Sequence, residues 1–396
     1  MMRNLLILLI FLLPSCSRVF FVDNTRLIPA PKEPVEIEFQ SHRGLLFIKA
    51  TINGKKGLFL FDNGFSHSAV NPAFAKKAGI VFDKDVKLSD AHDRSVHIPK
   101  TTLDTLHIRD QTFVNTMVYQ IDTDNFLPCY KFDGILGASV INEINWKIDF
   151  DTEKMLLSSV PFPATGTELR VTYLENNSAT LPLALGNRTF NTKIDFGKTG
   201  NFQVRQALVE EYFKGEKVVE TYGVTSFSTH GPGDPETKYK LAAGQSIWYG
   251  EEALPLPAQV RISEDLKYEA YLGMGYLRKY SPLVINSTLA TYVLPDTNSS
   301  AYMANDTAYG MVIYKTGENK WQIIQKNVTD PMMKDIRVND EVVAINGRPF
   351  SNFTLCDYQD YIKDKLDKKD TVFLEIKGRK EILSLTPRKP TETIFD

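Results

Sequence analysis

Residues 46–70 read LFIKATINGKKGLFLFDNGFSHSAV, and residues 181–204, LPLALGNRTFNTKIDFGKTGNFQV, repeat the order of their features. Each stretch has an apolar strand, a turn that contains asparagine and glycine, and a second strand that ends in an aspartate. The two aspartates open the triplets Asp62-Asn63-Gly64 and Asp195-Phe196-Gly197. We interpret the two stretches as copies of one β hairpin.

A second matching landmark follows each aspartate at a similar distance. Apolar residues precede Gly137 in the first half and Gly273 in the second, and a short helix-like stretch follows each glycine. Four landmarks in one order at nearly equal spacing favour a duplicated lobe over two unrelated β domains. We therefore predict two lobes that are copies of one plan, covering residues 37–160 and 161–298.

The composition fits an ordinary globular protein with a large core. The chain has 396 residues, of which 43% are apolar and 24% are charged, and its net charge is −2. A nearly neutral chain lacks the excess of basic residues that a nucleic-acid binder needs, so no nucleic-acid partner is expected. Three cysteines are too few for a disulfide framework, and we interpret Cys129 and Cys356 as small buried apolar residues.

The N-terminus predicts export and lipid attachment. A short basic start, the apolar run LLILLIFLL and the residues Pro14-Ser15 lead to Cys16. The run is too short to span a bilayer, so residues 1–16 are predicted to be a signal peptide. The end of this segment resembles the bacterial lipobox, which implies lipidation at Cys16, a tether over residues 17–36 and a place in the bacterial cell envelope, facing the periplasm or on the cell surface. The alternative is an ordinary signal peptide with an incidental cysteine.

The order of strand, Asp-x-Gly turn, long β segment, apolar-apolar-Gly and short helix resembles the aspartic peptidase fold. It is most similar to bacterial retropepsin-like aspartyl proteases, which carry two lobes in one chain and often a C-terminal PDZ domain. The resemblance spans residues 37–390 and implies a mainly β acid-protease fold in which a pseudo-twofold axis relates the two lobes. It implies that Asp62 and Asp195 form the catalytic dyad, with a peptide or protein as substrate and neither a cofactor nor a metal.

Such a dyad works because two carboxyl groups held about 3 Å apart share one proton. The ionised carboxylate takes a proton from water, and the protonated one donates to the scissile carbonyl oxygen. One aspartate from each lobe is therefore enough for peptide hydrolysis.

The middle residues of the two triplets depart from the family pattern of Asp-Thr-Gly or Asp-Ser-Gly, in which the hydroxyl donates across the axis to the opposite loop. Asn63 can still donate through its amide, whereas Phe196 cannot donate and should change the packing between the loops. Lys198 either places a cation near the dyad, which would favour ionisation of both carboxyls, or points to solvent. The sequence therefore leaves open a second hypothesis, a catalytically degenerate lipoprotein that binds peptides or proteins on the same fold.

Aspartic peptidases also need a segment that covers the substrate. Two stretches between an aspartate and its glycine landmark are candidates, residues 87–100 and residues 222–239. The second is rich in glycine, proline and polar residues, which is typical of a loop that moves. The sequence does not decide between them.

The C-terminal part predicts a small β domain with one helix. A capping box at Thr354 and apolar residues at helical spacing indicate a helix over residues 355–366. The run Val338-Asn-Asp-Glu-Val-Val-Ala-Ile-Asn-Gly347 resembles a motif of PDZ domains, and the resemblance implies a PDZ-like domain at residues 308–390. It also implies a peptide-binding groove between this helix and the strand near residues 321–328. The alternative is a domain that only packs against the lobes.

Other catalytic chemistries lack their motifs. The chain contains no His-Glu-x-x-His, no Gly-x-Ser-x-Gly and no Walker loop. His92 and His97 lie in a polar segment that we interpret as a solvated hairpin rather than a metal site. The sequence thus favours an aspartic endopeptidase over other hydrolases.

Overall fold

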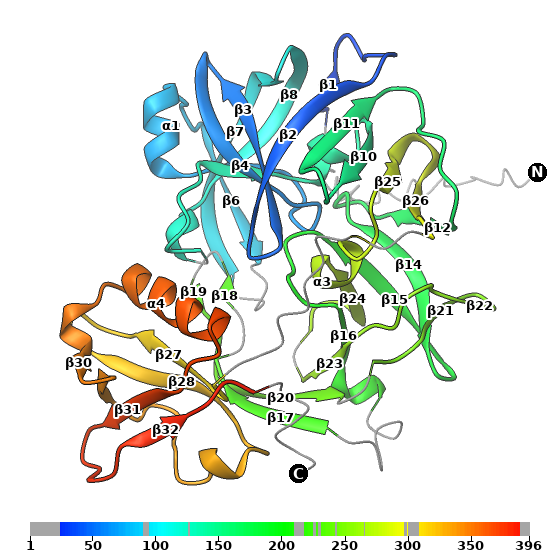
Figure 1. The fold of residues 1–396 in the computed structure, drawn as a ribbon. Helices are drawn as coiled ribbons and strands as arrows, with labels where there is room; N and C mark the ends of the chain where they lie inside the picture. The colour runs from blue at the N-terminus through cyan, green and yellow to red at the C-terminus, as the bar shows by residue number, and fades with distance from the viewer. Residues whose placement is uncertain are drawn as a thin grey trace, which may run out of the picture.

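The computed structural model describes residues 24–89, 95–125, 127–209, 218–224, 227–228, 231–241, 244–264, 266–296, 299 and 309–388. The predicted signal peptide, Cys16, His92 and the first part of the tether lie outside this set. Strands dominate the described chain, and the expected mainly β fold is confirmed (Figure 1). No helix among the described residues is both long enough and apolar enough to cross a membrane.

The first lobe is built around a strand that ends just before Asp62. Its elements are β1 Arg26–Leu27, β2 Val35–His42, β3 Leu45–Ile52, β4 Lys55–Phe61, β5 Ser68–Val70, α1 Pro72–Ala78, β6 Lys84–Ser89, β7 Ser95–Ile108, β8 Gln111–Gln120, β9 Gly134–Leu136, α2 Ala138–Ile141, β10 Asn145–Asp149 and β11 Lys154–Ser158. Strand β4 is parallel to β9, β9 is antiparallel to β5, and β5 is parallel to β8. The Asn53-Gly54 turn joins β3 to β4, and both residues have positive φ, as a tight hairpin requires.

The second lobe repeats this pairing. Its elements are β12 Thr167–Arg170, β13 Thr172–Tyr173, β14 Ala179–Leu185, β15 Arg188–Asp195, β16 Phe202–Arg205, β17 Val218–Gly223, β18 Phe227–Ser228, β19 Gly231–Pro232, β20 Glu236–Leu241, β21 Ile247–Tyr249, β22 Glu252–Ala253, β23 Val260–Ser263, β24 Ala270–Gly273, α3 Met274–Leu277, β25 Leu283–Asn286 and β26 Thr291–Leu294. Strand β15 is parallel to β24, β24 is antiparallel to β16, and β16 is parallel to β23. The series of strand pairings that begins at the aspartate strand is therefore the same in both lobes.

A shared sheet joins the lobes. Its order is β12-β26-β25-β10-β11-β2, and β10 pairs with β25 at the centre, in the register Trp146 opposite Ile285. Three strands from each lobe thus flank the pseudo-twofold axis. One hydrophobic core runs through both lobes and includes Phe61, Trp146 and Phe196, so the lobes fold against each other rather than as separate bodies.

The C-terminal unit has a core of its own. Its elements are β27 Met311–Lys315, β28 Trp321–Asn327, β29 Val342–Ile345, β30 Arg348–Pro349, α4 Leu355–Asp367, β31 Val372–Ile376 and β32 Leu383–Leu385. Helix α4 begins with the expected capping box, because the Thr354 side chain accepts from the backbone N–H of Asp357 and the Asp357 carboxylate accepts from that of Thr354. The buried Trp321 packs against Phe350 and Tyr358 at the centre of this core.

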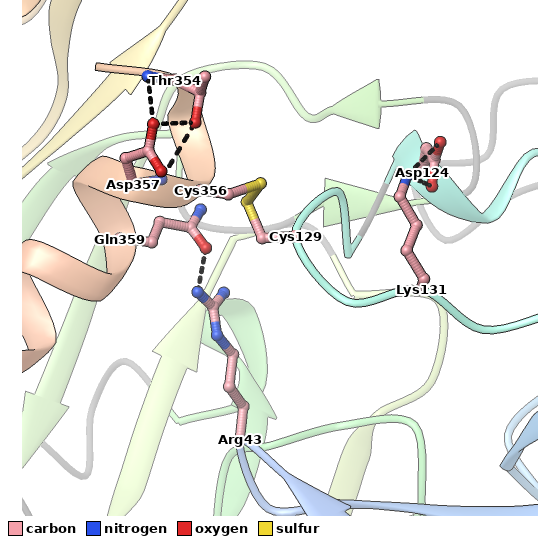
Figure 2. Close-up of a disulfide and its surroundings, with 8 residues drawn as sticks. All are labelled: Arg43, Asp124, Cys129, Lys131, Thr354, Cys356, Asp357 and Gln359. Carbon is pink, nitrogen blue, oxygen red and sulfur yellow. Dashed lines mark hydrogen bonds and ion pairs between the residues drawn. A yellow bond between two sulfur atoms is a disulfide. The ribbon is translucent and has the colours of Figure 1, made fainter. Parts of the chain in front are cut away.

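This unit is attached to both lobes (Figure 1). A disulfide joins Cys356 near the start of α4 to Cys129 of the first lobe, with 5.2 Å between their Cα atoms, and Arg43 donates to Gln359 beside it (Figure 2). On the other side, β28 pairs with β17 of the second lobe. The C-terminal unit therefore bridges the two halves of the duplicated body.

Two expectations are corrected here. The two cysteines are half-buried and bonded to each other, so reading them as buried apolar residues was wrong; they are 227 positions apart, and only the packing of α4 on the first lobe brings them together. The peptide groove expected beside residues 321–328 has no free strand edge there. Strand β28 pairs with β27 on one side and contacts β17 and Glu341 on the other.

Candidate active site

Asp62 and Asp195 occupy equivalent positions at the ends of matching strands. Asp62 follows β4, and its backbone N–H donates to the carbonyl oxygen of Leu136 at 3.0 Å. Asp195 is the last residue of β15, in register with Gly273 of β24. Each residue is 8% exposed, so both carboxyls are largely shielded from water.

The glycines of the two triplets bring the loops together. The N–H of Gly64 donates to Asp62 Oδ1 at 2.7 Å, and the N–H of Gly197 donates to Asp195 Oδ1 at 2.9 Å. A methyl group on Gly64 would overlap the carboxylate of Asp195, and one on Gly197 would overlap that of Asp62. Each carboxylate thus lies directly against the glycine of the opposite loop, and the structure brings the two predicted aspartates together.

The pair is electrostatically coupled. Burial and, after it, the charge of Asp195 raise the pKa of Asp62 to about 7, against the opposing effects of Lys193 and of the N–H groups of Gly64 and Gly197. Two buried carboxylates that lie close together repel each other, so the site retains one proton up to nearly neutral pH.

Asn63 bonds across the axis in a way that the sequence did not predict. Its side-chain oxygen accepts from the backbone N–H of Phe196 at 2.9 Å, and its amide donates to the Tyr292 hydroxyl at 3.1 Å. Asn63 therefore donates to the second lobe, as expected, through its bond to Tyr292, and it also accepts a bond from the opposite loop that was not expected. Asn63 is 1% exposed, so both bonds are made away from water.

Phe196 lies under the loops and is fully buried. Its ring stacks on Phe61 at 5.8 Å between centroids and meets Tyr292 edge-on at 6.4 Å. The expected change in packing is thus an aromatic cluster that joins the strand before Asp62 to the loop after Asp195. Apolar contact in the second triplet takes the place of a hydroxyl bond.

Lys198 does not point freely into solvent. Its ammonium group lies 4.3 Å from the centre of the Tyr271 ring and donates to Gln203 at 3.5 Å. Burial lowers the pKa of Lys198, while the charge of Asp195 opposes that change. The predicted cation is therefore near the dyad and is held by an aromatic face.

Lys193 is a site residue that the sequence reasoning missed. It lies two residues before Asp195 on β15, is 6% exposed, and donates from Nζ to the carbonyl oxygen of Gly64 at 2.7 Å. A lysine in a strand with apolar neighbours, on the same face as the aspartate by strand alternation, was the available signal.

The two glycine landmarks, Gly137 and Gly273, allow neighbouring segments of the backbone to approach closely. A methyl group on Gly137 would overlap the carbonyl oxygen of His67, and one on Gly273 would come within 2.5 Å of the carbonyl oxygen of Gly200. Each glycine precedes a short helix, α2 or α3, packed behind the aspartate loop of its own lobe. Both positions therefore support the loops from behind.

The two candidate covering segments differ in their surroundings. Residues 87–100 belong to the β6–β7 hairpin, whose tip at residues 90–94 lies outside the described residues. Residues 222–239 belong to the β17–β20 hairpin, whose strand β17 is bound to β28. Within the described ranges, no group of three or more His, Cys, Asp or Glu side chains is placed to hold a metal ion.

Comparisons with known proteins gave a match to one family model and similarity to solved structures. Residues 48–140 match the family model of aspartyl proteases, a region that includes Asp62, Asn63, Gly64 and Gly137. Among solved structures, the chain is similar to a retropepsin-like aspartic protease from Rickettsia conorii, with 21% identity and a TM-score of 0.24, over 34% of this chain and 90% of that one. No curated protein matches the sequence. The family match thus lies within the first lobe and includes the first of the two aspartate triplets.

Proposed function

We propose that this protein is an aspartic endopeptidase that hydrolyses polypeptides with Asp62 and Asp195. The observation that carries the proposal is the contact of each carboxylate with the glycine of the opposite loop, at the axis between two equivalent lobes. A water held between the carboxyls would lose a proton to the ionised one, while the protonated one donates to the scissile carbonyl oxygen. The two glycine N–H groups keep the carboxyls in place for this exchange.

The proton affinity of the two carboxyls sets the pH range in which the proposed peptidase would be active. A dyad needs one proton, and the pKa of Asp62 is raised to about 7 by burial and by Asp195. We expect hydrolysis to persist to nearly neutral pH and to fall as the last shared proton is lost. Such a range fits work in the cell envelope, where lipidation at Cys16 would anchor the chain.

The C-terminal unit is proposed to be PDZ-like. Within the described chain, β27 is the last strand of its sheet, beyond β28, so an added peptide strand would extend the sheet at that edge. We propose that an extended peptide binds at this edge rather than beside β28.

Digestion of a peptide library from about pH 3 to about pH 8 tests the main proposal. Asp62→Asn and Asp195→Asn should each reduce kcat/KM by about 10³-fold or more, because each variant removes one partner of the shared proton. Leu60→Met, a volume-conserving change beside the site, should retain activity. Cleavage that survives both aspartate substitutions would refute the dyad. Peptide binding by a wild-type chain that never cleaves would instead support the degenerate binding protein.

A further inference from the structure

The two lobes differ at the position two residues before the aspartate. In the first lobe this position is Leu60, which is 2% exposed and in register with Ile135 of β9. In the second lobe it is Lys193, which is 6% exposed and in register with Tyr271 of β24. A buried lysine is costly unless it has partners, so its presence at one of two equivalent positions calls for a specific role.

The contacts of Lys193 define that role. Its Nζ donates to the carbonyl oxygen of Gly64 at 2.7 Å and lies 4.9 Å from the centre of the Tyr268 ring. Gly64 in turn donates to Asp62. The ammonium group therefore connects the strand that carries Asp195 to the loop that carries Asp62, across the axis.

No ion pair of the described residues involves Lys193, so its charge is not neutralised by a surface carboxylate. The titratable groups around Lys193 include Asp195 on its own strand, Asp62 on the opposite loop, Lys198 on the following loop, Tyr268 before β24 and Tyr271 on β24. Glu269, which accepts from the N–H of Asn191 on the same strand, is exposed to solvent, so the buried acidic groups are the two aspartates. The field of Lys193 therefore acts on the dyad.

We propose that Lys193 is a positioning residue of the dyad, one that fixes the Asp62 loop across the axis and holds down the proton affinity of the carboxyl pair. The charge effect follows because a nearby cation favours the ionised carboxylate. The pKa of Asp62, although raised by burial and by Asp195, is held lower by Lys193 than it would otherwise be. The inference deepens the proposed peptidase function, and it has a test that needs no turnover.

Three substitutions of Lys193 separate the effect of its hydrogen bond to Gly64 from the effect of its positive charge. Lys193→Met removes both, Lys193→Gln keeps a donor for Gly64 without the charge, and Lys193→Arg keeps the charge. Titration of the side-chain carboxyl of isotope-labelled Asp62 by NMR, assigned with Asp62→Asn, measures the midpoint directly. We expect the midpoint, about 7 in the unaltered chain, to rise by about one pH unit in the Met and Gln variants and to stay in place with Arg.

The matched control is Leu60→Met, the same kind of change at the equivalent position of the first lobe, which should not move the midpoint. If the chain is a peptidase, the basic limb of kcat/KM should move with the NMR midpoint in each variant. An unchanged midpoint in the Gln variant overturns the inference. The inference is also overturned if the chain folds with Arg at position 193 but not with Met or Gln, because the role of Lys193 is then structural. Absence of cleavage by the unaltered chain refutes the peptidase proposal alone, because the NMR titration still decides the role of Lys193.

Discussion

The two lobes of this protein share a backbone plan and differ in the side chains placed on it. In both, the aspartate strand has the same parallel and antiparallel neighbours, and a glycine-led short helix supports its loop. In the first lobe the middle residue of the triplet is the hydrogen-bonding Asn63, and in the second it is the apolar Phe196. The residue two before the aspartate is Leu60 in one lobe and Lys193 in the other.

The comparison shows which features both lobes must have for their aspartate loops to pack together at the axis. Both carboxylates and both loop glycines are repeated, because each loop packs against the other and a side chain on either glycine would overlap an aspartate. The loop bridge is not repeated. One lobe supplies polar bonds and the other supplies an aromatic ring, and together they perform one bridging role.

Removing the aromatic half of the bridge should have the largest effect on stability. Phe196→Ala deletes a fully buried ring that contacts Phe61 and Tyr292, and we expect it to lower the free energy of unfolding by about 4 kcal/mol. Urea denaturation followed by tryptophan fluorescence measures this, since Trp146 packs edge-on against Phe61.

The matched change in the first lobe is Asn63→Ala. It leaves the N–H of Phe196 and the hydroxyl of Tyr292 without this partner, and we expect a smaller loss of about 2 kcal/mol. If Asn63→Ala proved the more damaging of the two, the polar bonds rather than the ring would hold the loops, and the division of roles between the lobes would be wrong.

The C-terminal unit is also attached differently to the two lobes, and each attachment can be broken separately. The first lobe holds it by the Cys129–Cys356 disulfide and the second by the β17–β28 pairing. Cys356→Ser should lower the free energy of unfolding of the oxidised protein by about 3 kcal/mol, because the bond closes a long loop. Denaturation with and without a thiol reductant measures the effect.

Cys129→Ser is the matched control and should give the same loss, with no further loss when both cysteines are replaced. A reductant should lower the stability of the unaltered chain to that of either variant and leave the variants unchanged. A wild-type transition that does not respond to the reductant would show that the β17–β28 pairing alone holds the unit.

Much of this arrangement could be predicted from local sequence. The hairpins ending in Asp62 and Asp195 follow from strand alternation and turn residues, and the start of α4 follows from its capping box. The meeting of the two aspartates was implied by the resemblance to aspartic peptidases, which the repeated triplets and glycine landmarks suggested. Each of these features depends on residues that are close together in the sequence or on a pattern that the sequence repeats.

The remaining features depend on contacts between distant segments. The disulfide forms because α4 packs against the first lobe, and nothing near Cys129 or Cys356 indicates that. The same holds for the bond from Lys193 to Gly64, which needs both lobes in place. The pairing of β17 with β28 turned an edge expected to bind peptide into an internal strand.

The last prediction concerns the pH dependence of stability that the two aspartates produce. Burial and Asp195 raise the pKa of Asp62 from 3.8 to about 7, so the folded chain keeps a proton that the unfolded chain has lost. The free energy of unfolding should therefore fall as pH rises from about 4 to about 7, by about 2 kcal/mol between pH 5 and pH 7, and level off above that range. Asp62→Asn should lack this fall, and Asp195→Asn should show less of it because the repelling charge is gone. Urea denaturation at several pH values measures the slope, and an unaltered chain as stable at pH 7 as at pH 5 would contradict the shared proton.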